Sequence, residues 1–183
     1  MTDETVDLPA PIVPGVARAL SPLIRRIAVD LGGAVGPNTY LVGIDEIAVI
    51  DPGPDLDSHL DAIAGCGGDR IRWILTTGTG DQAGIKGLAA RTGAEVLAME
   101  GVGPADAHET VGEDHTVLGT EFRLVTLGAP GAPEPRALFF LEEERVLFAG
   151  DVVSDLESKL LVDRRLRRLR AVAPADGQLL ERG

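Results

Sequence analysis

Residues 48–53 read Ala-Val-Ile-Asp-Pro-Gly, an apolar run that ends in an acid followed by a Pro-Gly pair. The β-branched residues predict a buried strand over Ile47–Asp51, which must stop there because proline has no N–H to give to a sheet. Two runs of similar composition precede it, Ile27–Leu31 and Thr39–Ile44. Gly-rich and acidic segments separate the three runs, so we expect three adjacent strands with residues 43–46 as a hairpin connection.

Downstream of residue 53, helical and strand patterns alternate. A first helix is closed by the glycines of residues 65–68, and a second helix ends near Gly93. The strands that follow them are predicted over Ile71–Thr76 and Glu95–Met99. Such a β-α-β-α-β order implies parallel strands buried between layers. The residues that mark the helices by their spacing are Leu56, Leu60 and Ile63 in the first and Ile85, Leu88 and Ala89 in the second.

The second half of the chain is again rich in apolar runs. Residues 100–118 are acidic and contain glycine, and we expect irregular structure there. Three runs then predict strands over Glu121–Leu127, Arg136–Leu141 and Val146–Ala149. Leucines at roughly helical spacing predict a closing helix over Asp155–Val172.

The N-terminal segment differs in composition from the rest. Residues 1–20 are Pro-rich and acidic at their start, and we expect a loose leader, followed by a short helical turn over Ser21–Arg26. Residues 21–183 are expected to form one domain, because 183 residues suffice for one sizeable core. The two strand-rich halves predict two sheets that pack between helices.

The overall charge and the cysteine content exclude several classes of protein. The net charge is -12 and the sequence pI about 4.6, so we do not expect a broad nucleic-acid surface. A single cysteine, Cys66, permits neither an internal disulfide nor a zinc site of several cysteines. The chain has no signal-peptide pattern and no apolar run of membrane-spanning length. These features predict a cytoplasmic protein.

Five landmarks in this order and spacing resemble a known superfamily. Residues 38–42 with 48–53 look like the opening of metallo-β-lactamase-fold hydrolases of the glyoxalase-II-like branch, and residues 74–84 look like their first metal-binding loop. Pro130-Gly131, residues 146–151 and residues 174–177 resemble three later landmarks. The resemblance implies an α/β fold, a four-layer αβ/βα sandwich shortened at its C-terminus. It places the site on loops at one edge of the sheets.

The resemblance also implies which positions would bind metal. In the family the first loop has the pattern His-any-His-any-Asp-His, and further ligands follow on the later loops. Five of the seven positions lack the expected histidine, and only Asp81 and Asp151 keep their identity. In this chain the seven positions hold Thr77, Thr79, Asp81, Gln82, Ala132, Asp151 and Asp176.

Zinc favours imidazole and thiolate ligands, and the family's hydrolysis depends on a zinc-bound hydroxide. We therefore predict no zinc centre and no cofactor. The expected protein is a non-catalytic one that keeps the scaffold to bind a ligand or a protein partner. A catalytic paralogue or a second copy of the chain could be that partner. The ligand pocket is expected to contain Thr77, Thr79, Gln82 and Ala132.

Two alternatives use the same loops. Asp81, Asp151 and Asp176 could form an oxygen-rich site for Mg²⁺, Mn²⁺ or Ca²⁺, or act as acid and base in a cryptic hydrolase. The simpler interpretation is that Asp81 and Asp151 accept hydrogen bonds from backbone amides and fix the loops. Gly78 and Gly80 could also shape an anion site at a helix start, although the charge of Asp81 would oppose it.

A third alternative is an interaction module on the predicted closing helix. Five arginines lie within seven residues there, and they could contact an acidic partner or could form an ordinary solvated face. The three histidines, His59, His108 and His115, match none of the ligand positions, and we expect them to be surface or structural residues. The arginines are Arg164, Arg165, Arg167, Arg168 and Arg170.

Overall fold

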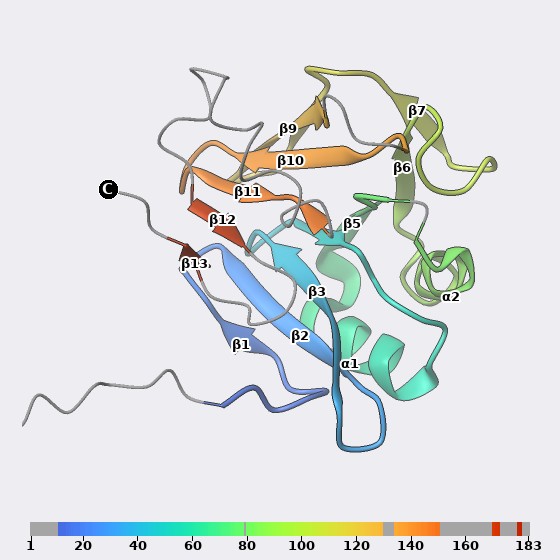
Figure 1. The fold of residues 1–183 in the computed structure, drawn as a ribbon, viewed down its shortest axis with the longest axis vertical. Coiled ribbons are helices and arrows are strands. Elements are labelled where there is room, and N and C mark those ends of the chain that lie inside the picture. Colours follow the sequence, from blue (N-terminus) through green and yellow to red (C-terminus); the bar gives the residue numbers. More distant parts are fainter. Residues whose placement is uncertain (1–10, 79, 130–133, 151–169, 173–178, 181–183) are drawn as a thin grey trace, which may run out of the picture.

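The computed structural model describes residues 11–78, 80–129, 134–150, 170–172 and 179–180, and these form two β-sheets and two α-helices. The first sheet has seven strands in sequence order (Figure 1). The second sheet has six strands and runs from β13 at one edge to β8 at the other. The strands of the first sheet are β1 (Arg18–Ala19), β2 (Ile24–Asp30), β3 (Val35–Val42), β4 (Ile47–Ile50), β5 (Ile71–Leu75), β6 (Glu95–Met99) and β7 (Glu109–Val111). Those of the second are β8 (Thr116–Leu118), β9 (Arg123–Gly128), β10 (Ala137–Leu141), β11 (Val146–Phe148), β12 (Arg170–Val172) and β13 (Leu179–Leu180).

The direction of the strands follows from their connections. From β1 to β4 the neighbours are antiparallel, because short turns join them. From β4 to β7 they are parallel, and α1 (Asp57–Gly67) and α2 (Gln82–Thr92) supply the crossovers within β4–β5–β6. A 3₁₀ turn over Gly68–Arg70 leads from α1 into β5. This arrangement confirms the predicted β-α-β-α-β unit.

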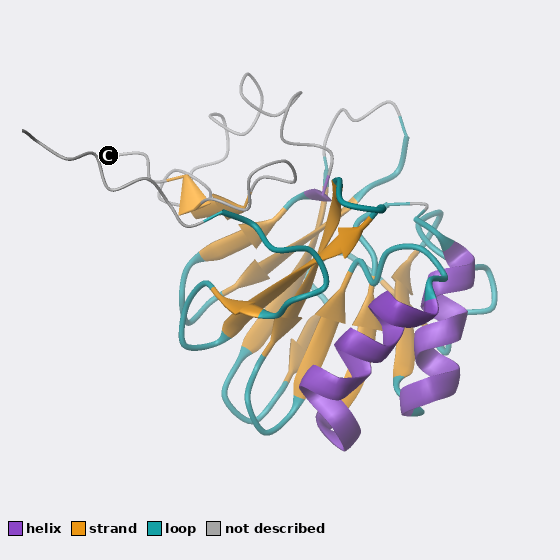
Figure 2. Cartoon of the chain, turned by 90° about the horizontal axis from the view of Figure 1, so that it is seen from below, coloured by secondary structure: helices purple, strands orange, loops and turns teal. Residues whose placement is uncertain are grey.

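The core has two main layers, one on each face of the first sheet. Strand β4 shows this directly: Ile47 and Val49 pack toward the helices, whereas Ala48 and Ile50 pack toward the second sheet. All four are fully buried, as expected for a strand covered on both faces. Figure 2 shows both helices on the outer face of one sheet, with the other sheet on its opposite side.

A third apolar cluster lies on the other face of β10 and β11. Leu138 and Leu147 are each 1% exposed there, although neither faces the first sheet. A sheet buried on both faces is what a four-layer sandwich requires. The α/β two-sheet architecture is thus confirmed. The predicted closing helix lies outside the described residues, apart from its last three positions.

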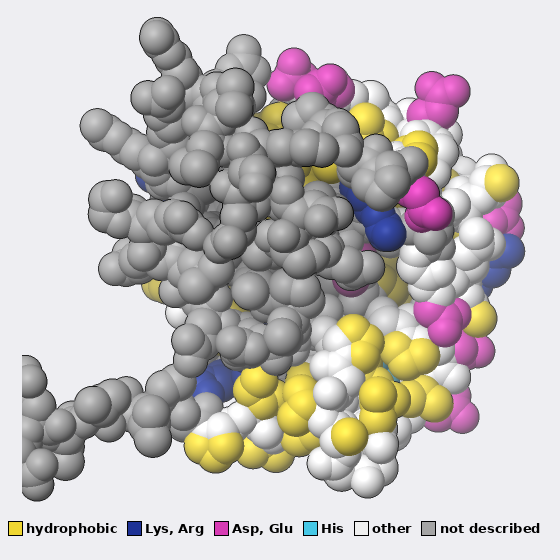
Figure 3. All heavy atoms as spheres, in the orientation of Figure 1, with side chains coloured by type: hydrophobic (Ala, Val, Ile, Leu, Met, Phe, Trp, Pro, Cys, Tyr) yellow, Lys and Arg dark blue, Asp and Glu magenta, His cyan; other side chains and the backbone are white. Residues whose placement is uncertain are grey.

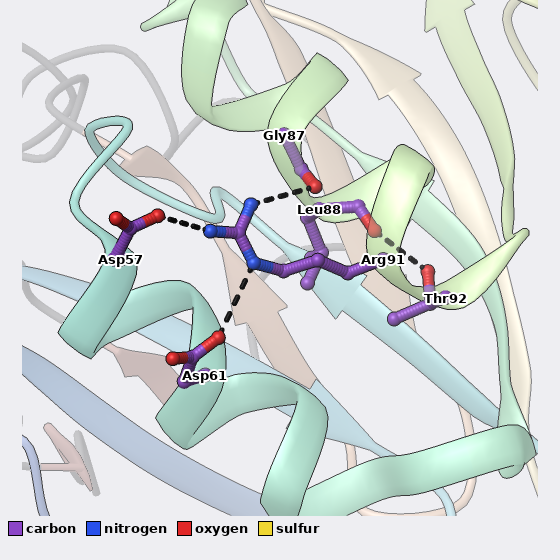
Figure 4. A network of polar contacts seen from close by, with 6 residues as sticks. All are labelled: Asp57, Asp61, Gly87, Leu88, Arg91 and Thr92. Carbon is purple, nitrogen blue, oxygen red and sulfur yellow. Dashed lines mark hydrogen bonds and ion pairs between the residues drawn. The ribbon is translucent and has the colours of Figure 1, made fainter.

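The two helices are held by specific capping and cross-helix contacts. The Asp81 carboxylate accepts hydrogen bonds from the N–H groups of Ala83 and Gly84 at the start of α2. Gly93 ends that helix in the left-handed conformation, at φ +70°. Arg91 joins α2 to α1, since its guanidinium contacts the carboxylates of Asp57 and Asp61 (Figure 4). None of the helices among the described residues is long and apolar enough to cross a membrane.

The structure corrects four local predictions. Residues 24–26 begin β2 rather than a helical turn, and Arg26 pairs with Tyr40 across the sheet. The segment expected to be irregular, residues 100–118, contains β7 and β8. Residues 170–172 form β12, parallel to β11, rather than the end of a helix. Within the expected leader, residues 18–19 form the short strand β1 beside β2.

Apolar side chains also gather on one outer surface. Val13 and Val16 precede β1, and Leu31 and Val35 lie at the β2–β3 hairpin; all four are about half exposed. Figure 3 shows hydrophobic side chains collected on the lower part of this face, where Figure 1 places these segments.

Candidate functional site

A cavity of about 370 Å³ lies where the loops after β4 and β5 meet the ends of β10 and β11. Its wall includes residues from the start of β3, from both loops and from the first turn of α2. Two of the predicted site residues, Thr77 and Asp81, line it. The volume falls within the range of small-molecule pockets.

Asp51, directly after β4, organises the loops around the cavity. Its backbone is in the left-handed region, at φ +52°, and its N–H donates to the Leu75 carbonyl at 2.9 Å. This turn directs the carboxylate at Thr77, whose N–H donates to Oδ1 at 2.8 Å and whose hydroxyl donates to Oδ2 at 2.7 Å. Both carboxylate oxygens therefore have a partner within the protein.

Thr77 connects the two sheets as well. Its carbonyl accepts a hydrogen bond of 2.9 Å from the N–H of Ala137, the first residue of β10. Gly150, after β11, packs so closely that a Cβ there would lie 2.1 Å from the Thr77 hydroxyl oxygen. Thr77 is consequently enclosed, at 4% exposure. Its N–H and hydroxyl are hydrogen-bonded to Asp51, and its carbonyl is hydrogen-bonded to Ala137.

Asp81 has a structural task in the described residues. It caps α2, with distances of 3.0 and 3.3 Å from Oδ1 to the N–H groups of Ala83 and Gly84. The start of α2 packs against the loop after β4, where a Cβ on Gly84 would lie 1.9 Å from the Gly53 carbonyl oxygen. The interpretation of Asp81 as a residue that fixes its loop agrees with this geometry.

Arg136, just before β10, brings positive charge to the cavity. Its guanidinium lies over Gly78, where a Cβ would be 2.0 Å from Nη1. Glu134 is its carboxylate neighbour at 3.8 Å, too far for a hydrogen bond. A side chain at position 78 would therefore displace the guanidinium of Arg136. Figure 3 shows Lys or Arg atoms beside acidic ones on the face that it presents.

Tyr40, on β3, contributes a buried hydroxyl. The residue is 7% exposed, and its ring packs against that of Phe148 at a centroid distance of 5.3 Å. Within the described structure the hydroxyl makes no hydrogen bond of standard geometry, although the Asn38 side chain is close enough to influence it as a hydrogen-bonding neighbour. Burial raises the pKa of Tyr40 to about 12, although the charge of nearby Arg26 and the neighbouring Asn38 side chain act in the opposite direction. The hydroxyl thus keeps its proton at neutral pH and can donate it.

A buried histidine supports the same loop from behind. His59 on α1 is 3% exposed, and its Nε2 lies 2.9 Å from the hydroxyl of Thr39. That hydroxyl donates to the Asp51 carbonyl at 2.8 Å. Burial lowers the pKa of His59, so the imidazole is neutral at neutral pH. The structural role predicted for His59 agrees with these contacts.

The other predicted residues are distributed as follows. Gln82 is exposed at the start of α2 and does not line the cavity. His108 is exposed and accepts a hydrogen bond from the Val96 N–H. His115 is half-buried. The remaining predicted positions lie outside the described residues: Thr79, Ala132, Asp151, Asp176, Arg164, Arg165, Arg167 and Arg168, while of Arg170 only the backbone, in β12, is described.

Sequence reasoning missed Tyr40 and Arg136 as residues of the cavity. The polar groups of the described wall are carboxylates, hydroxyls, an amide and a guanidinium, without imidazole or thiolate. Across the described ranges no three His, Cys, Asp or Glu side chains come together in a way that could hold a metal ion. These residues do not fit a zinc site of the usual kind.

Comparison with solved structures shows a shared fold. The chain matches a metallo-beta-lactamase family protein from Thermus thermophilus, with 18% identity over 89% of this chain and 76% of the other, at a TM-score of 0.69. It also matches a subclass B3 metallo-beta-lactamase of Bradyrhizobium japonicum, with 20% identity over 75% of this chain and 62% of the other, at a TM-score of 0.60.

A third match is a metallo-beta-lactamase from Cronobacter sakazakii described by its HARLDQ motif, with 17% identity and a TM-score of 0.60. That match covers 75% of this chain and 63% of the other. The chain therefore spans less than two thirds of the length of both lactamases. No protein-family model matches it, and no curated protein matches it significantly. These likenesses show the metallo-β-lactamase fold.

Proposed function

We propose that this chain, which has the metallo-β-lactamase fold, is a non-catalytic protein that binds a small ligand in the cavity beside Thr77 without a zinc centre. The observation that carries the proposal is the environment of Thr77. Both its N–H and its hydroxyl donate to Asp51, at 2.8 and 2.7 Å. A side chain held in this way serves the loop rather than a metal ion.

The partner of Thr77 strengthens the argument. A metal-bound imidazole usually donates its second N–H to a carboxylate, which fixes the orientation of the ring. Asp51 is the carboxylate beside position 77, and it accepts from a hydroxyl and a backbone amide instead. These contacts give the loop an internal anchor with threonine at position 77, which supports the proposal.

Gln82 carries less weight than Thr77. The Cronobacter sakazakii lactamase is described by a motif that ends in Asp-Gln, as residues 81–82 do here. A glutamine at that place therefore occurs in a protein called a metallo-beta-lactamase. The same motif begins with histidine, whereas residue 77 is threonine. The difference at position 77 is the one that supports loss of the zinc chemistry.

The test is elemental analysis of untagged protein purified without chelator, combined with thermal-shift titrations against Zn²⁺, Mn²⁺, Mg²⁺ and Ca²⁺. The expected result is less than a tenth of an equivalent of metal and no cation-dependent rise of Tm. Hydrolysis of a chromogenic cephalosporin and of a simple thioester should equal the rate without protein. Near-stoichiometric zinc, or zinc-dependent hydrolysis, would overturn the proposal.

The Asp151→Asn variant separates the cation alternative from the non-catalytic one. A site built on Asp81, Asp151 and Asp176 predicts that Mn²⁺ or Mg²⁺ raises the Tm of the wild type and not of the variant. That outcome would replace the proposal by a hard-cation site. The proposal expects instead that neither protein changes its Tm when the cations are added.

The proposal includes a protein partner for the non-catalytic scaffold. A non-catalytic scaffold could bind a second copy of the chain or a catalytic paralogue, and the segment with Arg164, Arg165, Arg167 and Arg168 is the predicted contact. Sedimentation velocity at two protein concentrations distinguishes a self-associating chain from a monomer. A single monomeric species at both concentrations would contradict the proposed homodimer.

A further inference from the structure

The cavity beside Thr77 has an uneven supply of hydrogen-bond donors and acceptors. Two carboxylates in the cavity wall accept hydrogen bonds from within the protein and keep their negative charge. Asp51 accepts from the N–H and hydroxyl of Thr77, and Asp81 accepts from two N–H groups at the start of α2. The Thr76 hydroxyl is used as well, because it donates to the Gly78 carbonyl at 2.9 Å.

The Tyr40 hydroxyl is a donor in a different situation from these acceptors. Tyr40 lines the cavity, and its hydroxyl is buried without a hydrogen-bond partner in the described structure. A buried polar group of this kind destabilises a protein unless water or a ligand pairs with it. It is thus a donor that a ligand can satisfy with an acceptor atom.

Arg136 adds a positive charge to the same cavity and forms an ion pair with the exposed Glu134 at 3.8 Å. Only 24% of its side chain is exposed, so the guanidinium is partly shielded from water and its charge is screened less than at the surface. The absence of a side chain at Gly78 lets the guanidinium lie against the loop after β5. A planar guanidinium recognises carboxylate and phosphate groups with two parallel hydrogen bonds.

The start of α2 does not supply this charge. The anion site considered at Gly78 and Gly80 required N–H groups at that helix start. The Asp81 carboxylate already accepts from those of Ala83 and Gly84. A helix terminus capped by its own aspartate has little attraction left for an external anion. Among the described residues of the wall, the Arg136 guanidinium is the positive charge that an anion could contact, and it has to outweigh the negative charges of Asp51 and Asp81.

We infer that the cavity binds a small anion carrying a carboxylate or phosphate group, with Arg136 as the charge partner and the Tyr40 hydroxyl as a second donor. This rests on the proposed function, because it assigns to the cavity a ligand that this chain's own side chains bind without a metal ion. The anion class is the new element. It follows from two side chains on different sheets that line one cavity.

The experiment is a thermal-shift and calorimetric titration of metal-stripped protein in phosphate-free buffer at constant ionic strength. The probes are inorganic phosphate, glycerol 3-phosphate and citrate, with uncharged glycerol as the matched neutral compound. An anion present at about ten times its Kd should raise Tm by about 3–6 °C, whereas glycerol should not. No Tm rise and no binding heat with any anion would overturn the inference.

Two variants and a control make the assignment specific. Arg136→Gln should reduce the affinity for the anion at least tenfold. Arg123→Gln removes the same charge from an exposed site on β9, outside the cavity lining, and should leave the affinity unchanged. Equal losses in the two variants would show a nonspecific charge effect and would contradict the inference.

The Tyr40→Phe variant distinguishes a role of the hydroxyl in binding from a role in stability alone. Removing an unpaired buried hydroxyl should leave the Tm of the free protein unchanged or higher, while the anion-induced Tm rise becomes smaller. A variant that keeps the full rise would exclude Tyr40 as a donor. The zinc analysis is independent: bound zinc defeats the proposed function, whereas a metal-free protein without anion binding defeats only this inference.

Discussion

At the scale of single residues, a chain of polar contacts runs from helix α1 to the cavity. The imidazole of His59 contacts the Thr39 hydroxyl, which donates to the Asp51 carbonyl, and the Asp51 carboxylate holds Thr77. A hydroxyl has one hydrogen, and Thr39 gives it to Asp51. With this assignment Nε2 of His59 carries the proton, and Nδ1 is buried without a hydrogen bond of standard geometry in the described structure.

Acid should destabilise the fold through His59. Burial lowers the pKa of His59 below its usual value of 6.5. The unfolded chain therefore takes up a proton first as the pH falls, and the contribution of the neutral imidazole to stability is lost from about pH 6.5 down through the folded pKa. We expect His59→Gln, which keeps a neutral donor, to lose less unfolding free energy between about pH 7.5 and pH 5.0 than the wild type.

Urea unfolding at the two pH values measures this difference directly. His115→Gln is the control, because the His115 side chain makes no hydrogen bond within the described structure, and it should follow the wild type. Identical pH dependences for the wild type and His59→Gln would show that the buried imidazole contributes nothing to acid sensitivity.

Asp51 offers a second test at this scale. Asparagine tolerates the left-handed backbone at φ +52° but cannot accept with two carboxylate oxygens, so Asp51→Asn should lower the unfolding free energy by about 1–3 kcal/mol. Asp51→Ala should lower it by about 1–2 kcal/mol more, because alanine is strained in that conformation. Denaturant unfolding of the three proteins checks the order; an alanine variant as stable as the asparagine one would contradict it.

At the scale of elements, helix α2 is positioned by a close backbone approach. Gly84→Ala should destabilise the protein by several kcal/mol although alanine favours helices, because its Cβ would lie 1.9 Å from the Gly53 carbonyl oxygen. Gly65→Ala in α1 is the matched control: no atom lies within 4 Å of its added Cβ. That change should stabilise the protein by about 0.5–1 kcal/mol.

Thermal unfolding of the two glycine variants gives opposite signs if this packing is correct. A neutral Gly84→Ala would mean that α2 can move away from the loop after β4. The cavity should then also change, so anion titration of that variant is informative. Loss of binding together with stability ties the helix position to the site.

The success of sequence-based prediction differed between kinds of element. Long strands and both helices were predicted because their apolar periodicity is continuous, as over β4, β5 and α2. The short strands β7 and β8 were missed, since three residues such as Glu109–Val111 carry almost no periodic signal. The helical turn predicted over Ser21–Arg26 was wrong because two arginines interrupt the apolar pattern of a strand there. Arg26 is nevertheless buried, at 3% exposure.

The residues of the site likewise fall into those that local sequence patterns predicted and those that they missed. Thr77 and Asp81 were found because they follow one strand in a recognisable order. Arg136 was missed because it comes from the second sheet, and only the packing of the two sheets brings it over Gly78. Tyr40 was missed because its hydroxyl has meaning only once the burial around it is known. Contacts between distant segments were therefore the part that local patterns could not supply.

At the scale of the whole molecule, carboxylates join the two sheets at the edge opposite the cavity. Glu121 accepts from the N–H groups of Ile44 and Asp45 in the β3–β4 turn. Glu144, in the β10–β11 turn, accepts from the Leu23 N–H at 3.0 Å and from the Ser21 hydroxyl. The turns of one sheet are thus tied to those of the other by acid–amide contacts.

These ties predict a pH dependence of a second kind. The hydrogen bond from the Asp45 N–H is the largest of the influences that lower the pKa of Glu121. A lowered carboxyl pKa stabilises the fold above the unfolded value near 4.5, and the stabilisation is lost as the pH falls through the folded value. Glu121→Gln should therefore have a lower Tm than the wild type at about pH 7, and the two should converge near pH 3.

Tm measured in steps from about pH 7 to pH 3 tests this convergence. Glu100→Gln, at an exposed position after β6, should remain parallel to the wild type throughout. A constant offset between Glu121→Gln and the wild type would show that the amide contacts do not depend on the carboxylate charge.

The order of strands in the first sheet bears on how the protein is made. Because β1 to β7 lie side by side in the order of synthesis, each strand can join the growing sheet as it leaves the ribosome. No position waits for a later segment to be inserted, and that sheet has all its described strands once Val111 has emerged. The face of Ala48 and Ile50 must then stay uncovered until β8–β11 follow. A nascent chain of this length is the form in which chaperones would be needed most.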